Sequence, residues 1–141
     1  MRKRQIIVDN GPESVGPYSV AMQVGPYVLV SGQLPLDENF ELVSDDVGVQ
    51  TRKIIENIEL VLKEAGMSLD DVVKTTVYVE NLDDFKKINQ IYAIYFSHPY
   101  PVRSCVEVSK LPQNAKIKID CLAVEATLDE EEDCAGCCCE D

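Results

Sequence analysis

Histidine is nearly absent from the sequence: His98 is the only one among 141 residues. A pair of histidines sharing acid and base roles is therefore excluded, and so is a metal site built from several imidazoles. His98 lies directly before Pro99, at the expected end of a helix, where a structural role is the simpler interpretation. The chain also lacks the motifs G-x-G-x-x-G, P-loop, G-x-S-x-G and H-E-x-x-H. The body of the chain thus predicts neither a cofactor nor a metal.

Basic residues are scarce as well. There are 13 lysines and arginines against 25 aspartates and glutamates, a formal net charge of −12. Residues 125–141 hold eight of the acids and no base, which leaves 17 acids against 13 bases in the rest of the chain. Nucleic-acid binding depends on a basic surface that displaces counterions from phosphates. The charge distribution therefore argues against a nucleic-acid partner.

Long apolar runs are missing too. No stretch approaches the roughly 18 residues of a membrane-spanning helix, so no membrane insertion is expected. The first residues, "MRKRQIIVDN", are basic but are followed by only three apolar residues, too few for a signal peptide. Apolar residues make up 45% and charged residues 27%, as in ordinary globular domains. We therefore expect one cytoplasmic domain with a substantial core.

Alternating and helical apolar patterns predict the element order β-β-β-α-β-α-β-β. The expected strands are residues 5–9, a hairpin over 20–33 that turns at Gly25, then 71–80, 102–109 and 115–126. One helix follows a cap at Asp45 or Asp46 and ends at Gly66, and the other spans 81–96. Two amphipathic helices and one mixed sheet make a two-layer α+β fold with both helices on one face.

The other face of this sheet is expected to face solvent or a partner. Leu29, Val77, Val79 and Val106 supply more apolar strand surface than two helices require. This surplus favours an oligomer that packs through its sheets.

The domain is expected to span residues 1–126, and residues 127–141 form an acidic tail without periodicity, which predicts disorder. Four of the six cysteines lie in its "CAGCCC" segment. Thiolates clustered in this way bind soft metal ions, but the spacing is not that of a zinc fold, so an unstructured tail is the simpler interpretation. Cys105 and Cys121 are expected to be reduced thiols.

The segment "PYPVRSCVEVSKLP", residues 99–112, carries the most unusual strand. Alternation places Arg103, Cys105 and Glu107 on one side of it. A guanidinium on the inward side of a strand is costly unless an anion pairs with it. That anion is either an internal carboxylate such as Glu107 or the carboxylate or phosphate of a ligand. Cys105 has no histidine near it in sequence, so packing is a simpler role for it than nucleophilic attack.

Two further segments are candidates for ligand binding. "GPYS", residues 16–19, is a turn-rich loop, and "SGQ", residues 31–33, ends an apolar strand. Gly32 in the second segment allows a backbone to approach a ligand closely. Both signals are weak when taken alone.

Taken together, these stretches resemble the RidA/YjgF family of enamine/imine deaminases. The resemblance rests on "GPYS", "VSGQLP", "NIELVLKEAG", "DVVKTTVYVENLDDFKKIN" and above all "PVRSCVEVSKLP" followed by "AKIKID". It runs collinearly from about residue 5 to residue 126. It implies a chorismate-mutase-like (YjgF-like) fold and a homotrimer whose sheets line a central barrel, with three sites between neighbouring chains.

The resemblance also implies an activity and a site. The activity is hydrolysis of reactive 2-imino or enamine acids, such as 2-iminobutanoate and 2-iminopropanoate, to 2-oxo acids and ammonia. By position, Arg103 is expected to hold the carboxylate of the small substrate. The residues expected to line the pocket, some of them from the adjacent chain, are Tyr18, Ser31, Gly32, Asn89 and Cys105.

One position departs from the family pattern. Lys118 stands where the deaminases place a glutamate thought to position the attacking water. Asp120, two residues on and on the same face, is one possible replacement, and Lys118 acting as a base is another. We therefore take Arg103 and Lys118 as the catalytic candidates.

The sequence is consistent with three functions. The first is the deaminase, and the second is a non-catalytic trimer that binds or senses 2-oxo acids or amino acids. The third is a thiol-dependent stress protein, which rests on Cys105 and the tail cysteines. Endoribonuclease activity, also attributed to the family, has little physical basis in an acidic chain without a histidine pair.

Overall fold

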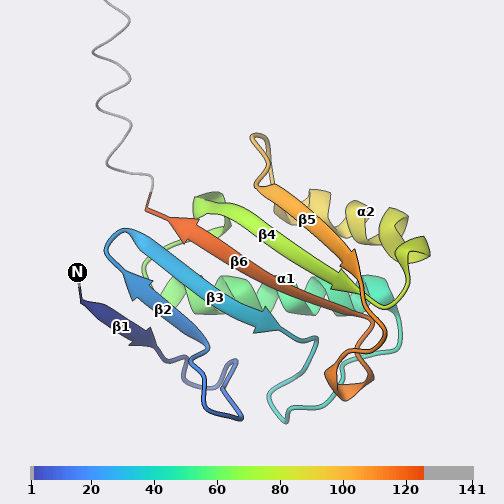
Figure 1. The fold of residues 1–141 in the computed structure, drawn as a ribbon, viewed down its shortest axis with the longest axis horizontal. Helices are drawn as coiled ribbons and strands as arrows, with labels where there is room; N and C mark the ends of the chain where they lie inside the picture. The colour runs from blue at the N-terminus through green and yellow to red at the C-terminus, as the bar shows by residue number, and fades with distance from the viewer. Residues whose placement is uncertain (1, 126–141) are drawn as a thin grey trace, which may run out of the picture.

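The computed structural model describes residues 2–125, which form one mixed six-stranded sheet with two helices behind it (Figure 1). The strands are β1 (Lys3–Ile6), β2 (Ala21–Val24), β3 (Tyr27–Gln33), β4 (Val72–Val79), β5 (Val102–Glu107) and β6 (Ile117–Val124). The helices are α1 (Val47–Glu64) and α2 (Phe85–Tyr95). The strand order is β1-β2-β3-β6-β4-β5, and only β4 and β5 run parallel. The predicted element order and the two-layer α+β class are confirmed.

Helix α1 begins and ends where the sequence places its signals. The Asp46 side chain accepts hydrogen bonds from the backbone N–H groups of Gly48 (2.8 Å) and Val49 (3.1 Å). This decides between the two predicted caps. Gly66 follows the helix with a positive φ of 73°, a conformation that glycine adopts without strain. The buried apolar face of the helix consists of Val47, Ile54, Ile55, Ile58, Val61 and Leu62.

The sheet is clearly two-sided. Along β6, buried and partly exposed residues alternate without interruption. Ile117, Ile119, Cys121 and Ala123 pack into the core, so Lys118 and its alternate neighbours lie on the open face. This register decides which side chains of the last strand are available for a site.

The open face carries part of the predicted apolar surplus. Leu29 is 49% exposed and Val106 is 44% exposed, as expected for residues that the helices do not cover. The prediction is wrong for Val77 and Val79, which are fully buried. They pair with Ile119 and Ile117 of β6, and this pairing places them on the side that packs against the helices.

Two other predictions concern membrane insertion and the C-terminal tail. Among residues 2–125, no helix combines the length and the apolar character needed to cross a membrane. The tail predicted from residue 127 onward lies outside the described residues.

Helix α2 offers a matched test of the core. Ile88 is fully buried on it, whereas Ile94 on the same helix is 67% exposed. Ile88→Ala should lower the free energy of unfolding by about 2–5 kcal/mol, because it removes buried methyl groups and leaves a cavity. Ile94→Ala should change the free energy of unfolding by less than about 0.5 kcal/mol. Chemical denaturation of both variants checks this, and equal effects would contradict the assigned orientation of α2.

Candidate active site

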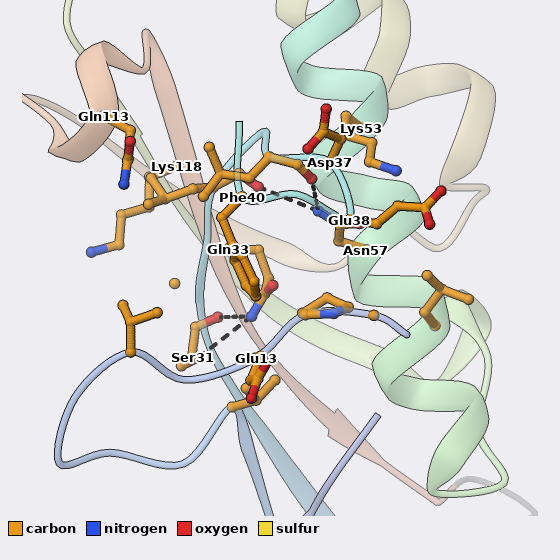
Figure 2. A pocket seen from close by; sticks show the side chains of 18 of the residues that line it. Glu13, Ser31, Gln33, Asp37, Glu38, Phe40, Lys53, Asn57, Gln113 and Lys118 are labelled. Atoms are coloured by element: carbon orange, nitrogen blue, oxygen red, sulfur yellow. Dashed lines mark hydrogen bonds between the residues drawn. The ribbon is translucent and has the colours of Figure 1, made fainter. Parts of the chain in front are cut away.

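A cavity of about 550 Å³ lies between the loop after β1, the loop after β3, helix α1 and the beginning of β6 (Figure 2). Four of the residues predicted for the site line it: Tyr18, Ser31, Gly32 and Lys118. They come from three separate segments of the chain. The fold therefore brings together the "GPYS" loop, the "SGQ" end of β3 and Lys118 on β6, the residue that differs from the family pattern.

A β-bulge shapes the wall of this cavity. Val30 pairs with Cys121 and Gln33 pairs with Ile119, so Ser31 and Gly32 together face the one residue Asp120. The extra residue turns this end of β3 away from regular pairing. Gln33 then donates its side-chain N–H to the backbone oxygen (3.2 Å) and to the Oγ (3.4 Å) of Ser31. The hydroxyl of Ser31 is thus held in place at the cavity wall.

Gly32 leaves space at the bulge for the side chain that crosses it. A Cβ at position 32 would overlap Cε of Lys118, so the methylene stem of the lysine lies directly on the glycine backbone. Lys118 Nζ lies 5.9 Å from the centroid of the Tyr78 ring. In Figure 2 the amine and Ser31 lie on the same side of the cavity. The absence of a side chain at position 32 therefore provides the space in which Lys118 reaches the cavity.

The far side of the cavity is polar and was not predicted. Asp37, Glu38 and Lys53 line it, and Figure 2 shows Lys53 beside Asp37 and away from Lys118, whereas Glu13 lies near Ser31. Asn57 of α1 donates to the backbone oxygens of Leu34 and Leu36, both at 3.3 Å, and so holds the loop that follows β3. No local sequence pattern indicated these residues, because the approach of the loop to α1 is a tertiary contact.

Asp120 does not share the cavity with Lys118. Its Oδ2 accepts a hydrogen bond of 3.3 Å from the hydroxyl of Tyr78, and Asp120 is not among the lining residues. The negative charge of Asp120 is the main reason that the pKa of Tyr78 is raised. The arrangement supports Lys118, not Asp120, as the residue that reaches the candidate site.

Arg103 lies elsewhere, on the edge strand β5. Its Cζ lies 4.9 Å from the ring centroid of Tyr92 and 5.7 Å from that of Phe85, two residues of α2. These rings hold the guanidinium by cation–π contact. The expectation that Arg103 is buried within the chain is wrong: it is exposed, because β5 is the edge of the sheet.

The internal partner considered for Arg103 is also wrong. Glu107 Oε1 accepts a hydrogen bond from the backbone N–H of Leu82 at 3.1 Å. The one ion pair within residues 2–125 joins Lys87 and Asp46. Arg103 therefore presents a guanidinium that the described part of the chain does not neutralise.

Asn89 and Cys105 belong to the same region as Arg103, not to the cavity. Asn89 is exposed on α2, and Cys105 is half-buried on β5. Burial raises the pKa of the Cys105 thiol, and nearby Arg103 only partly opposes this. One chain thus separates the predicted site residues into two groups, one around the cavity and one on β5 and α2. Within residues 2–125, no group of three or more His, Cys, Asp or Glu residues is arranged to bind a metal ion.

The fold defines a class of small α+β proteins with two helices on one face of a mixed sheet, and comparisons with known proteins identify its family. The family model described as Endoribonuclease L-PSP matches residues 8–125. A RutC family protein of Pyrococcus abyssi is 46% identical over 124 residues, covering 87% of this chain and 98% of its own. The 2-iminobutanoate/2-iminopropanoate deaminase of Salmonella typhimurium is 40% identical, covering 86% of this chain and 97% of its own.

Solved structures agree with these relatives. RidA from an Antarctic Psychrobacter has a TM-score of 0.81 at 37% identity, covering 86% of this chain and 99% of its own. TdcF of E. coli, solved with bound serine, has a TM-score of 0.80 at 36% identity, covering 86% of this chain and 98% of its own. The chain belongs to the RidA/YjgF family, and the resemblance seen in its sequence is confirmed.

The two body cysteines provide a test of the thiol hypothesis. Burial raises the pKa of the Cys105 thiol and raises that of Cys121 to about 12, so both have less thiolate at neutral pH than a free cysteine. We expect iodoacetamide to alkylate both residues more slowly at pH 7.5 than in the unfolded protein, with Cys121 the slower. Peptide mapping by mass spectrometry measures this. A Cys105 that reacts faster in the folded protein would contradict it and would favour a thiol-based function.

Proposed function

We propose that this protein hydrolyses reactive 2-imino and enamine acids, such as 2-iminobutanoate and 2-iminopropanoate, to 2-oxo acids and ammonia. Relatives that are 37–40% identical over almost their full length carry the name of this deaminase. The observation that carries the proposal is the pair of groups that such a substrate needs. An unneutralised guanidinium, Arg103, is available for the carboxylate, and a cavity with fixed polar groups is available for the reacting carbon.

We further propose that the active protein is a homotrimer with sites between neighbouring chains. Arg103 and Cys105 lie on the edge strand, away from the cavity around Lys118, so one chain by itself does not assemble the predicted site. The uncovered face of the sheet, with Leu29 and Val106, supplies an apolar surface for such assembly. A neighbouring copy would then place its Arg103 against the cavity of this chain.

In this assembly each group has a distinct task. Arg103 would bind the substrate carboxylate with two parallel hydrogen bonds, and the Tyr92 and Phe85 rings would hold the guanidinium plane. Ser31, oriented by Gln33, would donate or accept at the nitrogen of the imine. Uncatalysed imine hydrolysis is already fast, so orientation of the substrate and a few kcal/mol of barrier lowering are sufficient. We expect this reaction to take place in the cytoplasm.

A second function is favoured by one observation, the lysine at position 118. TdcF of E. coli has been solved with bound serine, so a relative of this fold holds a small amino acid. A cation at position 118 attracts small anions without supplying a carboxylate base. The second candidate is therefore a non-catalytic trimer that binds or senses small carboxylates. RNA cleavage, which the family description names, is not carried over, because the chain has a net charge of −12 and one histidine.

The two candidates separate in one assay. Serine or threonine dehydratase generates the 2-imino acid, and the appearance of the 2-oxo acid is followed with and without this protein. The deaminase predicts faster release that scales with the amount of protein. The binder predicts an unchanged rate together with measurable 2-oxobutanoate affinity by calorimetry.

Arg103 is the residue on which both candidates depend. Arg103→Ala should weaken 2-oxo acid binding by on the order of 2–3 kcal/mol, because a charge-assisted pair in a partly desolvated cleft is lost. Arg103→Lys should also bind poorly, since a point charge does not reproduce the bidentate contact. Calorimetry with 2-oxobutanoate measures both variants. Full affinity in Arg103→Ala, with the assembly intact, would remove Arg103 from the site.

The assembly itself is tested by molar mass. Three chains of 15.7 kDa have a mass of about 47 kDa, which light scattering after gel filtration should show at micromolar concentration. Leu29→Glu should shift the mass toward the monomer, because it places a charge on the uncovered face of the sheet. Val49→Glu is the matched control, since Val49 is similarly exposed but lies on α1. A wild-type monomer would contradict the shared site.

A further inference from the structure

The amine of Lys118 lies over the Tyr78 ring, 5.9 Å from its centroid, and forms no ion pair within residues 2–125. Residues 2–125 contain no carboxylate within ion-pair distance of it, and Asp120, on the same face of β6, is hydrogen-bonded to Tyr78. Its stem lies on Gly32 and its amine lies on the same side as Ser31, where the proposed function puts the reacting end of the substrate. A lysine at the wall of a cavity offers an amine, the group that forms Schiff bases with carbonyl and imine carbons.

We propose that Lys118 is the covalent nucleophile of this site and carries the substrate as a Schiff base. The inference rests on the proposed function, because it requires a 2-imino acid in the cleft. It goes beyond that function by assigning the attack on the substrate to an amine instead of a water molecule.

Other nucleophiles of the described chain are poorly suited to this task. Cys105 and Cys121 do not line the cavity, and burial raises the pKa of both thiols, which disfavours the reactive thiolate. The Ser31 hydroxyl is hydrogen-bonded to the amide of Gln33, which is not a base and does not accept its proton. Lys53 lines the cavity, but Figure 2 shows it on the far side, next to Asp37.

The chemistry balances without any further reagent. The neutral amine of Lys118 adds to the imine carbon, and a proton moves from its nitrogen to the former imine nitrogen. Ammonia then leaves, and the substrate carbon remains double-bonded to Lys118 Nζ. Water adds to that carbon, the bond to Nζ breaks, and the 2-oxo acid is released with the lysine regenerated. One imino acid and one water give one 2-oxo acid and one ammonia.

In the proposed assembly, Arg103 of a neighbouring copy would lie at the cavity that Lys118 lines. The same guanidinium would hold the substrate carboxylate, so the imine carbon is presented at a fixed distance from the carboxylate. Covalent attachment then divides one difficult step into two easier ones.

The Schiff base can be detected by forming it in reverse, from the product 2-oxo acid. The product 2-oxo acid condenses with Lys118 to give the same Schiff base, and cyanoborohydride reduces it to a stable secondary amine. We expect the full-length protein, treated with pyruvate and cyanoborohydride, to gain one reduced pyruvate per chain. Peptide mapping should place it on Lys118, and deaminase activity should fall in proportion to the modified fraction.

Two variants separate covalent attack from simple attraction. Lys118→Arg keeps the positive charge but loses the nucleophile, so it should bind 2-oxobutanoate by calorimetry yet lose the adduct and at least about tenfold of the deaminase rate. Gly32→Ala displaces the lysine stem without removing the amine, and should slow adduct formation while the free energy of unfolding changes little. Lys53→Arg is the matched control for selectivity and should still give the adduct on Lys118.

The outcomes distinguish this inference from the proposed function. If the wild type accelerates 2-oxo acid release and Lys118→Arg does so equally, the covalent route is overturned and the deaminase stands. Adducts that form equally on Lys53 and other lysines overturn it as well. If the wild type does not accelerate release, the proposed function fails, and the catalytic role of Lys118 fails with it.

Discussion

The constraint on which the rest of the structure depends is that both helices cover the same face of the sheet. Strands inside the sheet then divide their side chains between a dry core and an open face, as the strict alternation along β6 shows. Ile117 and Ile119 are committed to the core, and Lys118 between them is committed to the open face. A shift of this strand by one residue would bury the lysine and expose two isoleucines.

The position of the candidate site also depends on the open face of the sheet. The cavity lies where β3 bulges away from β6, and the bulge exists because Ser31 and Gly32 oppose a single residue. The methylene stem of Lys118 crosses Gly32 at this bulge. The local break in the ladder thus makes the wall of the cavity, and the hydrogen bonds of Gln33 and Asn57 keep the segments on either side in place.

The division of the predicted site residues is the main functional consequence of the fold. Arg103 contacts two aromatic rings of α2 at the edge of the sheet, whereas Lys118 and Ser31 line a cavity elsewhere in the same chain. In the proposed homotrimer, Arg103 of one chain would meet the cavity of its neighbour. Under that proposal, binding and reaction of the substrate would depend on assembly.

Much of this molecule is determined by local sequence. The order of elements, the Asp46 cap, the Gly66 helix end and the buried stripe of α1 follow from periodicity and capping, which act over a few residues. The candidate residues Tyr18, Ser31, Gly32, Asn89, Arg103 and Cys105 came from segments that resemble the RidA/YjgF family, and that resemblance needs only the order of residues along the chain. Tertiary structure decided the rest. The burial of Val77 and Val79, the exposure of Arg103 and the acidic far wall of the cavity depend on which strand lies at an edge and on how loops approach α1. These contacts join residues far apart in sequence, and no local pattern encodes them.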